Sequence, residues 1–313
     1  MTTTDAEELT SSFSASINED HEEQEPICSC SYPFPSSTVT TRNDSKRRWF
    51  HRILPHRQKT KISMLHLHHP SCPSTEKFNL SGRRLDASFI RGLSHSLTLP
   101  SASPRRLTHL TLTRNQLYRD PKCIRLLMKF LPTQSLRHLD LSWNGLNEEL
   151  IVPLGRNCLK QLSLLQSLRL SGNPIGPQGL QVLLQEGQLG RIPLVDLWEC
   201  DIADDGAALL GQAMAQGTTK FQRLVLHMNG IGNVGIQALA CGIMSCPSLT
   251  DLDLYCNNID HEGIQVLAPA LPYSNIERLN LRANRIGPCG AKSLAMVLKD
   301  TPALRKLLLC HNG

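Results

Sequence analysis

Apolar residues recur along most of this chain in one pattern, leucine-x-x-leucine-x-leucine-x-x-asparagine-x-isoleucine or leucine. Seven copies are complete, at residues 107–117, 136–146, 165–175, 192–202, 221–231, 249–259 and 276–286. A weaker copy with Leu80 and Leu85 precedes them, and a shortened copy ending at Asn312 follows. The third apolar position falls at residues 80, 112, 141, 170, 197, 226, 254, 281 and 309, so consecutive copies lie 27 to 32 residues apart.

Each copy predicts the same two elements. The leucine-x-leucine core alternates apolar and polar residues, which predicts a strand with its leucines pointing inward. The segments between copies, such as Gly179–Leu184 and Gly235–Ala240, place apolar residues on one face at helical spacing. Repeats of this length and motif are typical of an α/β leucine-rich repeat solenoid. We therefore expect a horseshoe with parallel strands on its concave side and helices on its convex side, because stacked units bury one continuous core.

Asparagine closes the strand motif in most copies, at residues 115, 144, 173, 229, 257, 284 and 312. Its amide can both donate to and accept from backbone groups that stacking would otherwise leave unpaired in the turns. Cys200 takes this position in one copy, and Arg83 takes it in the first. A glycine near each helix start, such as Gly235 or Gly290, is expected to let the helix approach the strand closely.

With isoleucine-glycine-x-x-glycine after the strand, as in Ile231–Gly235 and Ile286–Gly290, the repeat resembles the ribonuclease-inhibitor-like subfamily of leucine-rich repeats. That subfamily includes ribonuclease inhibitor, the Ran GTPase-activating protein and the sensor ends of NOD-like receptors. The resemblance covers about residues 76–313 and implies a solenoid that binds other proteins. In the Ran GTPase-activating protein, the same solenoid stimulates hydrolysis in the bound GTPase.

Charge and composition divide the chain into three parts. Residues 1–60 are predicted to be a disordered tail, because they lack periodic apolar residues. Residues 1–26 hold eight acids and no lysine or arginine, whereas residues 42–61 hold eight basic residues and one acid. Residues 61–75 are predicted to cap the solenoid, which fills residues 76–313 with about nine repeats, the last one truncated. The net charge of +6 is unevenly placed: outside residues 1–26 and 42–61, 25 basic and 18 acidic residues leave a moderate net charge of +7 on a large surface, so we expect no nucleic acid as a partner of the solenoid.

The N-terminus lacks the apolar segment of a secretory signal, and the 11 cysteines are an odd, scattered set. Both features predict reduced thiols in a cytoplasmic protein. The basic segment 46–61 leaves four interpretations open beside a solvated linker. They are a nuclear address read by an import receptor, a weak contact with an acidic membrane, a nucleic-acid patch, and docking of a partner helix.

Motifs for catalysis, metals and cofactors give no positive prediction. The glycines of Gly230–Gly235 match a dinucleotide fingerprint, but they stand in phase with the repeats and so predict an ordinary repeat turn. Two short His/Cys groups lack a second ligand pair at zinc-finger spacing: His66, His68, His69 and Cys72, and Cys28 with Cys30. We expect no enzyme, no cofactor, no metal and no small-molecule substrate.

The outward positions of the strands carry the candidate site. Residues between and just after the inward leucines point toward the concave side, and aromatic residues gather there on successive repeats. The predicted partner-binding residues are Trp143, Arg169, Asp196, Trp198, His227, Asp253, Tyr255 and Arg282. Ordinary solenoid surface is the alternative interpretation of the same positions.

These observations predict a non-enzymatic intracellular scaffold that binds a protein on its concave face. The alternative is a GTPase regulator similar to the Ran GTPase-activating protein, although no short motif transfers its functional residues to this chain. Ribonuclease inhibition is not expected, because a basic solenoid would repel basic ribonucleases. No helix follows the last motif, so we expect an open apolar edge at Leu304, Leu307 and Leu309, as a truncated gene product or an edge paired with another chain would have.

Overall fold

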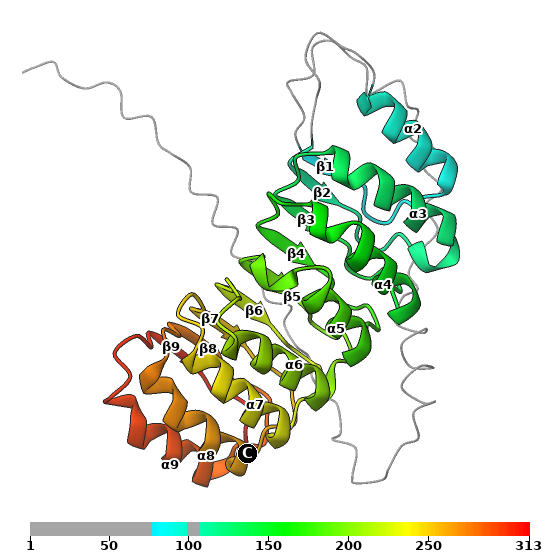
Figure 1. Cartoon of the computed structure of the whole chain (residues 1–313). Helices are drawn as coiled ribbons and strands as arrows, with labels where there is room; N and C mark the ends of the chain where they lie inside the picture. The colour runs from blue at the N-terminus through cyan, green and yellow to red at the C-terminus, as the bar shows by residue number, and fades with distance from the viewer. Residues whose placement is uncertain (1–76, 99–106) are drawn as a thin grey trace, which may run out of the picture. The chain divides into compact units, whose positions relative to one another are not determined.

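The computed structural model describes residues 77–98 and 107–313, which form one array of alternating strands and helices (Figure 1). The predictions for the tail at 1–60, for the cap at 61–75 and for the two His/Cys groups lie outside the described residues. The basic segment 46–61 lies outside them as well.

The strands form one nine-stranded parallel sheet whose order follows the sequence. Their bounds are β1 Lys77–Asn79, β2 His109–Thr111, β3 His138–Asp140, β4 Ser167–Arg169, β5 Leu194–Asp196, β6 Arg223–Val225, β7 Asp251–Asp253, β8 Arg278–Asn280 and β9 Lys306–Leu308. Each strand pairs with the next at its equivalent residues. Equivalent side chains therefore form straight rows across the sheet.

One helix follows each strand as far as β8 and returns the chain to the start of the next strand. The helices are α2 Ala87–Thr98, α3 Pro121–Phe130, α4 Glu148–Asn157, α5 Gly176–Gln185, α6 Ala203–Ala215, α7 Asn233–Met244, α8 His261–Leu267 and α9 Gly287–Leu298. Short 3-10 turns are η2 Leu117–Arg119, η3 Leu131–Thr133, η4 Leu159–Gln161, η5 Leu189–Arg191 and η6 Ala268–Tyr273. Figure 1 shows the helices in a row of their own beside the sheet. The predicted leucine-rich repeat solenoid is confirmed, with strands on the concave face and helices on the convex face.

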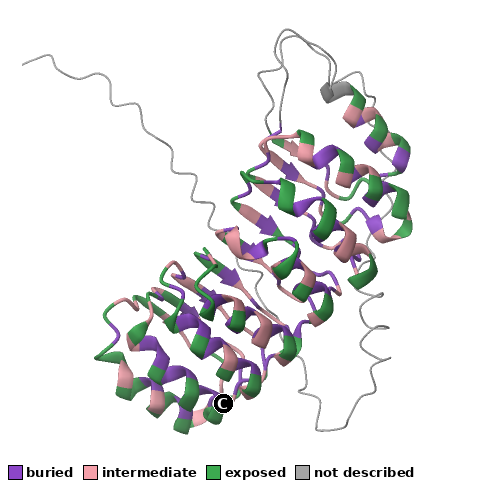
Figure 2. Ribbon diagram, in the orientation of Figure 1, coloured by how far each residue is buried: buried purple, intermediate pink, exposed green. Residues whose placement is uncertain are grey.

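The core lies between the sheet and the helix row, where Figure 2 shows the buried residues. The third leucines of six successive repeats are at most 2% exposed: Leu141, Leu170, Leu197, Leu226, Leu254 and Leu281. Each follows a strand residue that is in register with its counterparts on the neighbouring strands. The predicted single row of inward leucines is therefore confirmed.

The asparagine side chains form a hydrogen-bonded ladder along the stacked turns, as the sequence predicts. In Asn173, Nδ2 donates to the carbonyls of Leu141 (3.0 Å) and Leu170 (2.6 Å). Its Oδ1 accepts from the backbone N–H groups of Asn144 (3.0 Å) and Leu146 (2.9 Å). One amide thus pairs four backbone groups in two adjacent turns, and Asn144 itself is fully buried. Such pairing removes the cost of burying unsatisfied backbone groups.

The residue before each ladder position adopts the left-handed backbone conformation. Its φ lies between 52° and 68° at Gly82, Arg114, Trp143, Gly172, Glu199, Met228, Cys256, Ala283 and His311. Seven of these nine residues are not glycine, although left-handed geometry costs an L-residue about 1 kcal/mol. The asparagine ladder that follows holds each turn in this conformation. The left-handed geometry in turn sets the direction in which the side chain of the turn residue points.

The glycines at the helix starts have a different neighbour from the one expected. A Cβ on Gly235 would lie 2.9 Å from Cγ2 of Ile231 in its own turn and 3.0 Å from Cβ of Ala207 in the preceding helix. A Cβ on Gly290 would likewise meet Ile286 of its own turn at 2.5 Å. The close approach is thus between the helix, its own turn and the preceding helix, rather than between helix and strand.

The leucines of the last described turn are less buried than their counterparts in the middle of the array. Leu304, Leu307 and Leu309 are half-buried and pack against the core on their inner side only. Their counterparts in the middle of the array, such as Leu249 and Leu252, are 0% exposed. The difference follows from stacking, because a central repeat is covered on both sides and the last described one on a single side.

Candidate functional site

Seven of the eight predicted binding residues occupy two neighbouring rows on the concave face, and Trp143 lies in the turn beside them. Arg169, Asp196 and Asp253 are the last residues of β4, β5 and β7, and they share one row. Trp198, His227, Tyr255 and Arg282 stand two residues beyond the ends of β5 to β8. Trp143 stands three residues beyond the end of β3, in the left-handed turn position. The structure therefore places all eight predicted residues on or just after the strands.

Four of the eight residues contact one another as an aromatic ladder, which consists of Trp143, Trp198, His227 and Tyr255. The Trp198 and His227 rings stack with their centroids 5.0 Å apart and their planes 12° apart. The His227 and Tyr255 rings meet edge to face at 4.1 Å. The rings of Trp143 and Trp198 also meet edge to face, at 5.7 Å. The ladder presents a continuous aromatic surface across repeats that are separate in sequence.

Trp143 reaches Trp198 across an entire repeat because Gly172 leaves room for its ring. Gly172 occupies the same left-handed position in the intervening turn, with φ of 65°. A Cβ there would lie 2.5 Å from Cε3 and 2.7 Å from Cε2 of Trp143. Sequence reasoning missed Gly172, although its position 29 residues after Trp143 marks it as the equivalent turn residue of the next repeat.

Replacing Gly172 by alanine is expected to displace the Trp143 ring from Trp198 and to destabilise the fold by about 2 kcal/mol. The new methyl group would clash with the indole, and alanine would also be strained at positive φ. A shift in tryptophan emission measures the displacement, in a background with Trp49→Phe so that only Trp143 and Trp198 emit. Gly82→Ala is the matched control, because Gly82 has φ of 68° and open space around its Cα. An equal emission change in both variants would contradict the role of Gly172.

The two aspartates of the site accept hydrogen bonds from the backbone of two aromatic-ladder residues. Oδ1 of Asp196 accepts from the backbone N–H of Trp198 (3.1 Å), and Oδ1 of Asp253 accepts from that of Tyr255 (2.9 Å). Burial is the main cause that raises the pKa of both carboxyl groups. The sequence predicts these residues as part of the partner-binding site, and the structure gives them a contact that positions the backbone. The signal in the sequence is an aspartate two residues before Trp198 and two residues before Tyr255.

The centre of the ladder contains two buried polar atoms that no described residue satisfies. These are Nε1 of Trp198 and Nε2 of His227. Burial lowers the pKa of His227 to about 4, so its imidazole is neutral at pH 7. A neutral imidazole both donates and accepts one hydrogen bond. Because both nitrogen atoms are buried, a group that docks on the ladder would meet the accessible parts of the rings and not these two atoms.

Neither arginine of the site belongs to the ladder itself. Arg169 is exposed beside Asp196, and its positive charge offsets part of the rise that burial causes in the pKa of that carboxyl group. Arg282 follows Tyr255 on the next repeat, and its backbone N–H donates to Oδ1 of Asn280 (3.2 Å). The two guanidinium groups thus flank the aromatic surface from β4 and β8.

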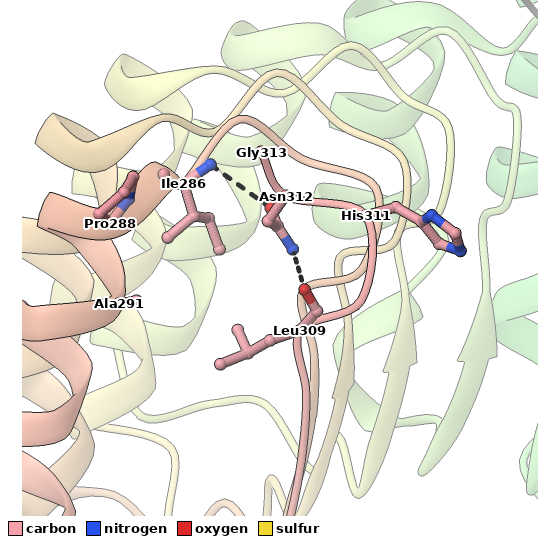
Figure 3. A pocket seen from close by; sticks show the side chains of 8 residues that line it. Ile286, Pro288, Ala291, Leu309, His311, Asn312 and Gly313 are labelled. Carbon is pink, nitrogen blue, oxygen red and sulfur yellow. Dashed lines mark hydrogen bonds between the residues drawn. The ribbon is translucent and has the colours of Figure 1, made fainter.

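A hollow of about 380 Å³ lies at the last turn, apart from the predicted residues (Figure 3). Its lining consists of Ile286, Gly287, Pro288, Ala291, Leu309, His311, Asn312 and Gly313. Asn312 spans it, donating from Nδ2 to the carbonyl of Leu309 (2.7 Å) and accepting at Oδ1 from the N–H of Ile286 (3.4 Å). The amide of Asn312 is therefore engaged in the asparagine ladder. The lining of the hollow contains one imidazole, that of His311, and no carboxylate.

Across residues 77–98 and 107–313, no three His, Cys, Asp or Glu side chains gather as the ligands of a metal ion would. Within the same ranges, no helix has the length and apolar character needed to cross a membrane. The cysteines of the core lie among apolar side chains, and burial raises the pKa of Cys158 to about 12. A thiol of that acidity is protonated and inert at neutral pH.

Comparison with protein families identifies the repeat. The family model described as Leucine Rich repeat matches residues 134–149, 161–184, 219–240, 245–268 and 274–295. The unmatched stretch at 185–218 includes the repeat in which Cys200 replaces the ladder asparagine.

Curated relatives align with much of the described array. The chain is 31% identical over 201 residues to NACHT, LRR and PYD domains-containing protein 13 from Homo sapiens, covering 62% of this chain and 18% of that protein. It is 30% identical over 242 residues to ribonuclease inhibitor from Sus scrofa, covering 66% and 52%. It is 27% identical over 240 residues to NACHT, LRR and PYD domains-containing protein 14 from Mus musculus, covering 75% and 24%. The chain thus spans about half the length of the ribonuclease inhibitor and a quarter or less of the other two.

Proposed function

Because this chain belongs to the ribonuclease-inhibitor-like leucine-rich repeat family, we propose that it is a non-enzymatic intracellular scaffold that binds a protein partner on its concave face. The aromatic ladder is the observation that supports this proposal most directly. Tryptophan and tyrosine dominate the energetic centres of protein interfaces, and here they form one contiguous surface with a histidine. The flanking charged residues would form the polar rim of such an interface.

The arrangement of the ladder favours binding over a purely structural role. The rings are half-buried, so each keeps an accessible edge. The carboxylates of Asp196 and Asp253 fix the backbone under the rings, which lowers the entropy lost when a partner docks.

Replacing Trp198 and Tyr255 by alanine together is expected to weaken capture of the partner at least a hundredfold, because two interface aromatics each contribute about 2 kcal/mol or more. The measurement is affinity capture on the immobilised full chain, quantified by mass spectrometry, with binding constants for proteins that the wild type retains. Circular dichroism checks that the variant keeps its fold.

Tyr273→Ala is the matched control, since Tyr273 is 75% exposed and lies outside the ladder. It should retain every protein that the wild type retains. Equal retention by the ladder variant and the wild type would refute the assignment of this face, whatever proteins are captured.

GTPase regulation, the alternative function, stays a prediction without a specific supporting observation. None of the three relatives named above is a GTPase-activating protein by name. We propose a cytoplasmic location. Nuclear entry through residues 46–61 is the alternative, and fluorescence microscopy of a tagged full chain distinguishes the two. The division into residues 1–60, 61–75 and 76–313 is likewise proposed.

A further inference from the structure

The first residues of the nine strands form one row across the concave face, named here the basic row. The pairing register aligns Lys77, His109, His138, Ser167, Leu194, Arg223, Asp251, Arg278 and Lys306. Side chains alternate along a strand, and the second residues point into the core, so these first residues point outward. Among its lysine, arginine and aspartate residues, four cations stand against one carboxylate, which gives these groups a formal net charge of +3.

The single acid of the row is shared between two cations. Oδ2 of Asp251 lies 3.6 Å from Nε of Arg223 and 3.6 Å from Nε of Arg278. The Asp251 side chain is 19% exposed, whereas those of Arg223 and Arg278 are 48% and 53% exposed. One carboxylate cannot neutralise two guanidinium groups, and both groups keep donors that face solvent. Both guanidinium groups can therefore donate hydrogen bonds to a further carboxylate that belongs to a binding partner.

The other end of the row has the same electrostatic character. The imidazoles of His109 and His138 stack with centroids 4.1 Å apart. Burial is the main cause that lowers the pKa of His138, and the next causes are His109, Lys77, Arg137 and Arg169. The cations around this pair thus come from β1, β4 and the residue before β3, and a negative group placed over the pair would be attracted by all three.

Resting on the concave-face function proposed above, we infer that the basic row binds an acidic peptide segment of the protein partner. Parallel strands lie about 4.8 Å apart, so the row from β1 to β9 spans about 38 Å. An extended peptide advances about 3.3 Å per residue, and about twelve residues therefore cover the row. Leu194, at 37% exposed, lies in the middle, where it would contact an apolar side chain of the segment.

A peptide fits this face better than a nucleic acid does. Asp140, Asp196 and Asp253 stand two residues beyond the basic row on β3, β5 and β7, beside the aromatic ladder. A nucleic acid stacked on the ladder would bring a phosphate at every nucleotide past these carboxyl groups. A peptide can place its carboxylates over the basic row alone and present other side chains to the second row.

The test is fluorescence anisotropy of the full chain with a fluorescein-labelled twelve-residue peptide of alternating glutamate and serine. Replacing Arg223 and Arg278 by glutamine together is expected to raise the Kd about tenfold, because two partly exposed ion pairs are lost and Asp251 then repels the peptide. Affinity for the wild type should also fall as salt rises from 50 to 300 mM. The same peptide with glutamine in place of glutamate should not bind.

Arg125→Gln with Lys292→Gln is the matched control, because it removes two exposed positive charges from helices α3 and α9. Its Kd should stay within twofold of the wild type, and an equal loss in both double variants would overturn the inference. Tighter binding of a twelve-nucleotide single-stranded DNA than of the acidic peptide would overturn it as well.

The captured partner separates this inference from the function on which it rests. A partner lost by the ladder variant and also weakened by the Arg223 and Arg278 variant supports both. A partner lost by the ladder variant and held unchanged by the arginine variant overturns the acidic-peptide inference alone. A partner held unchanged by both variants overturns the concave-face function itself.

Discussion

Replacing Asn173 by alanine is expected to lower the free energy of unfolding by about 4 kcal/mol. The change deletes the hydrogen bonds that Nδ2 donates to the carbonyls of Leu141, Leu170 and Ser171 and the two that Oδ1 accepts, all buried. The N–H groups of Asn144 and Leu146 would lose the acceptor that Oδ1 provides, and each unsatisfied buried group costs about 1 to 3 kcal/mol. Urea denaturation followed by circular dichroism at 222 nm measures the loss.

Asn258→Ala is the control for this prediction. Asn258 is exposed in the turn after β7, three repeats further along the array, and its backbone N–H, which the substitution leaves intact, donates to the carbonyl of Ile231. A surface change of this kind is expected to stay within about 0.5 kcal/mol of the wild type. If both variants unfold at the same urea concentration, the ladder does not contribute the stability assigned to it.

Cys200 shows what a weaker residue at the ladder position does. Its thiol donates to the carbonyl of Leu170 (3.3 Å), whereas an asparagine would also have a second N–H to donate to Leu197. The carbonyl of Leu197 instead accepts from Nδ2 of Asn229 alone (2.8 Å). In the same experiment, Cys200→Asn should therefore stabilise the array, and Asn173→Cys should cost less than Asn173→Ala.

The fold could be predicted from the sequence because every repeat contains the same pattern of apolar residues. An inward leucine row follows from apolar residues that return every 27 to 32 positions, and one weak copy cannot hide the others. The left-handed turn residues could not be predicted in this way. These residues differ widely in type, from Gly172 to Trp143 and Met228. Their backbone conformation is therefore imposed by the asparagine ladder and not by the local preference of each residue.

The candidate site could be predicted only as positions in rows. The strand register follows from the repeat, so Trp198, His227 and Tyr255 were expected side by side. The contact of Trp143 with Trp198 was not expected, because it depends on the missing side chain of Gly172 in the repeat between them. Ring orientations and the two unsatisfied nitrogen atoms depend on local packing, which a periodic pattern does not encode.

The second large effect is expected from Gly211→Val, which should destabilise the array by about 4 kcal/mol. Gly211 of α6 and Gly242 of α7 face each other at a close contact between the two helices. A Cβ on Gly211 would lie 2.6 Å from the carbonyl carbon of Ala238 and 3.0 Å from the backbone nitrogen of Leu239. Backbone atoms cannot rotate away as a side chain can, so the helices would have to separate and lose contacts along their length.

Gln212→Val separates this packing effect from the lower helix propensity of valine. Gln212 is the next residue of α6 and is exposed, so valine there should cost only about 0.5 kcal/mol. Urea denaturation measures both variants, and a loss at Gly211 no larger than that at Gln212 would contradict the close helix contact. A large loss at Gly211 alone means that every repeat depends on its neighbours, because the damage begins between α6 and α7 and spreads through the stacked interfaces on either side.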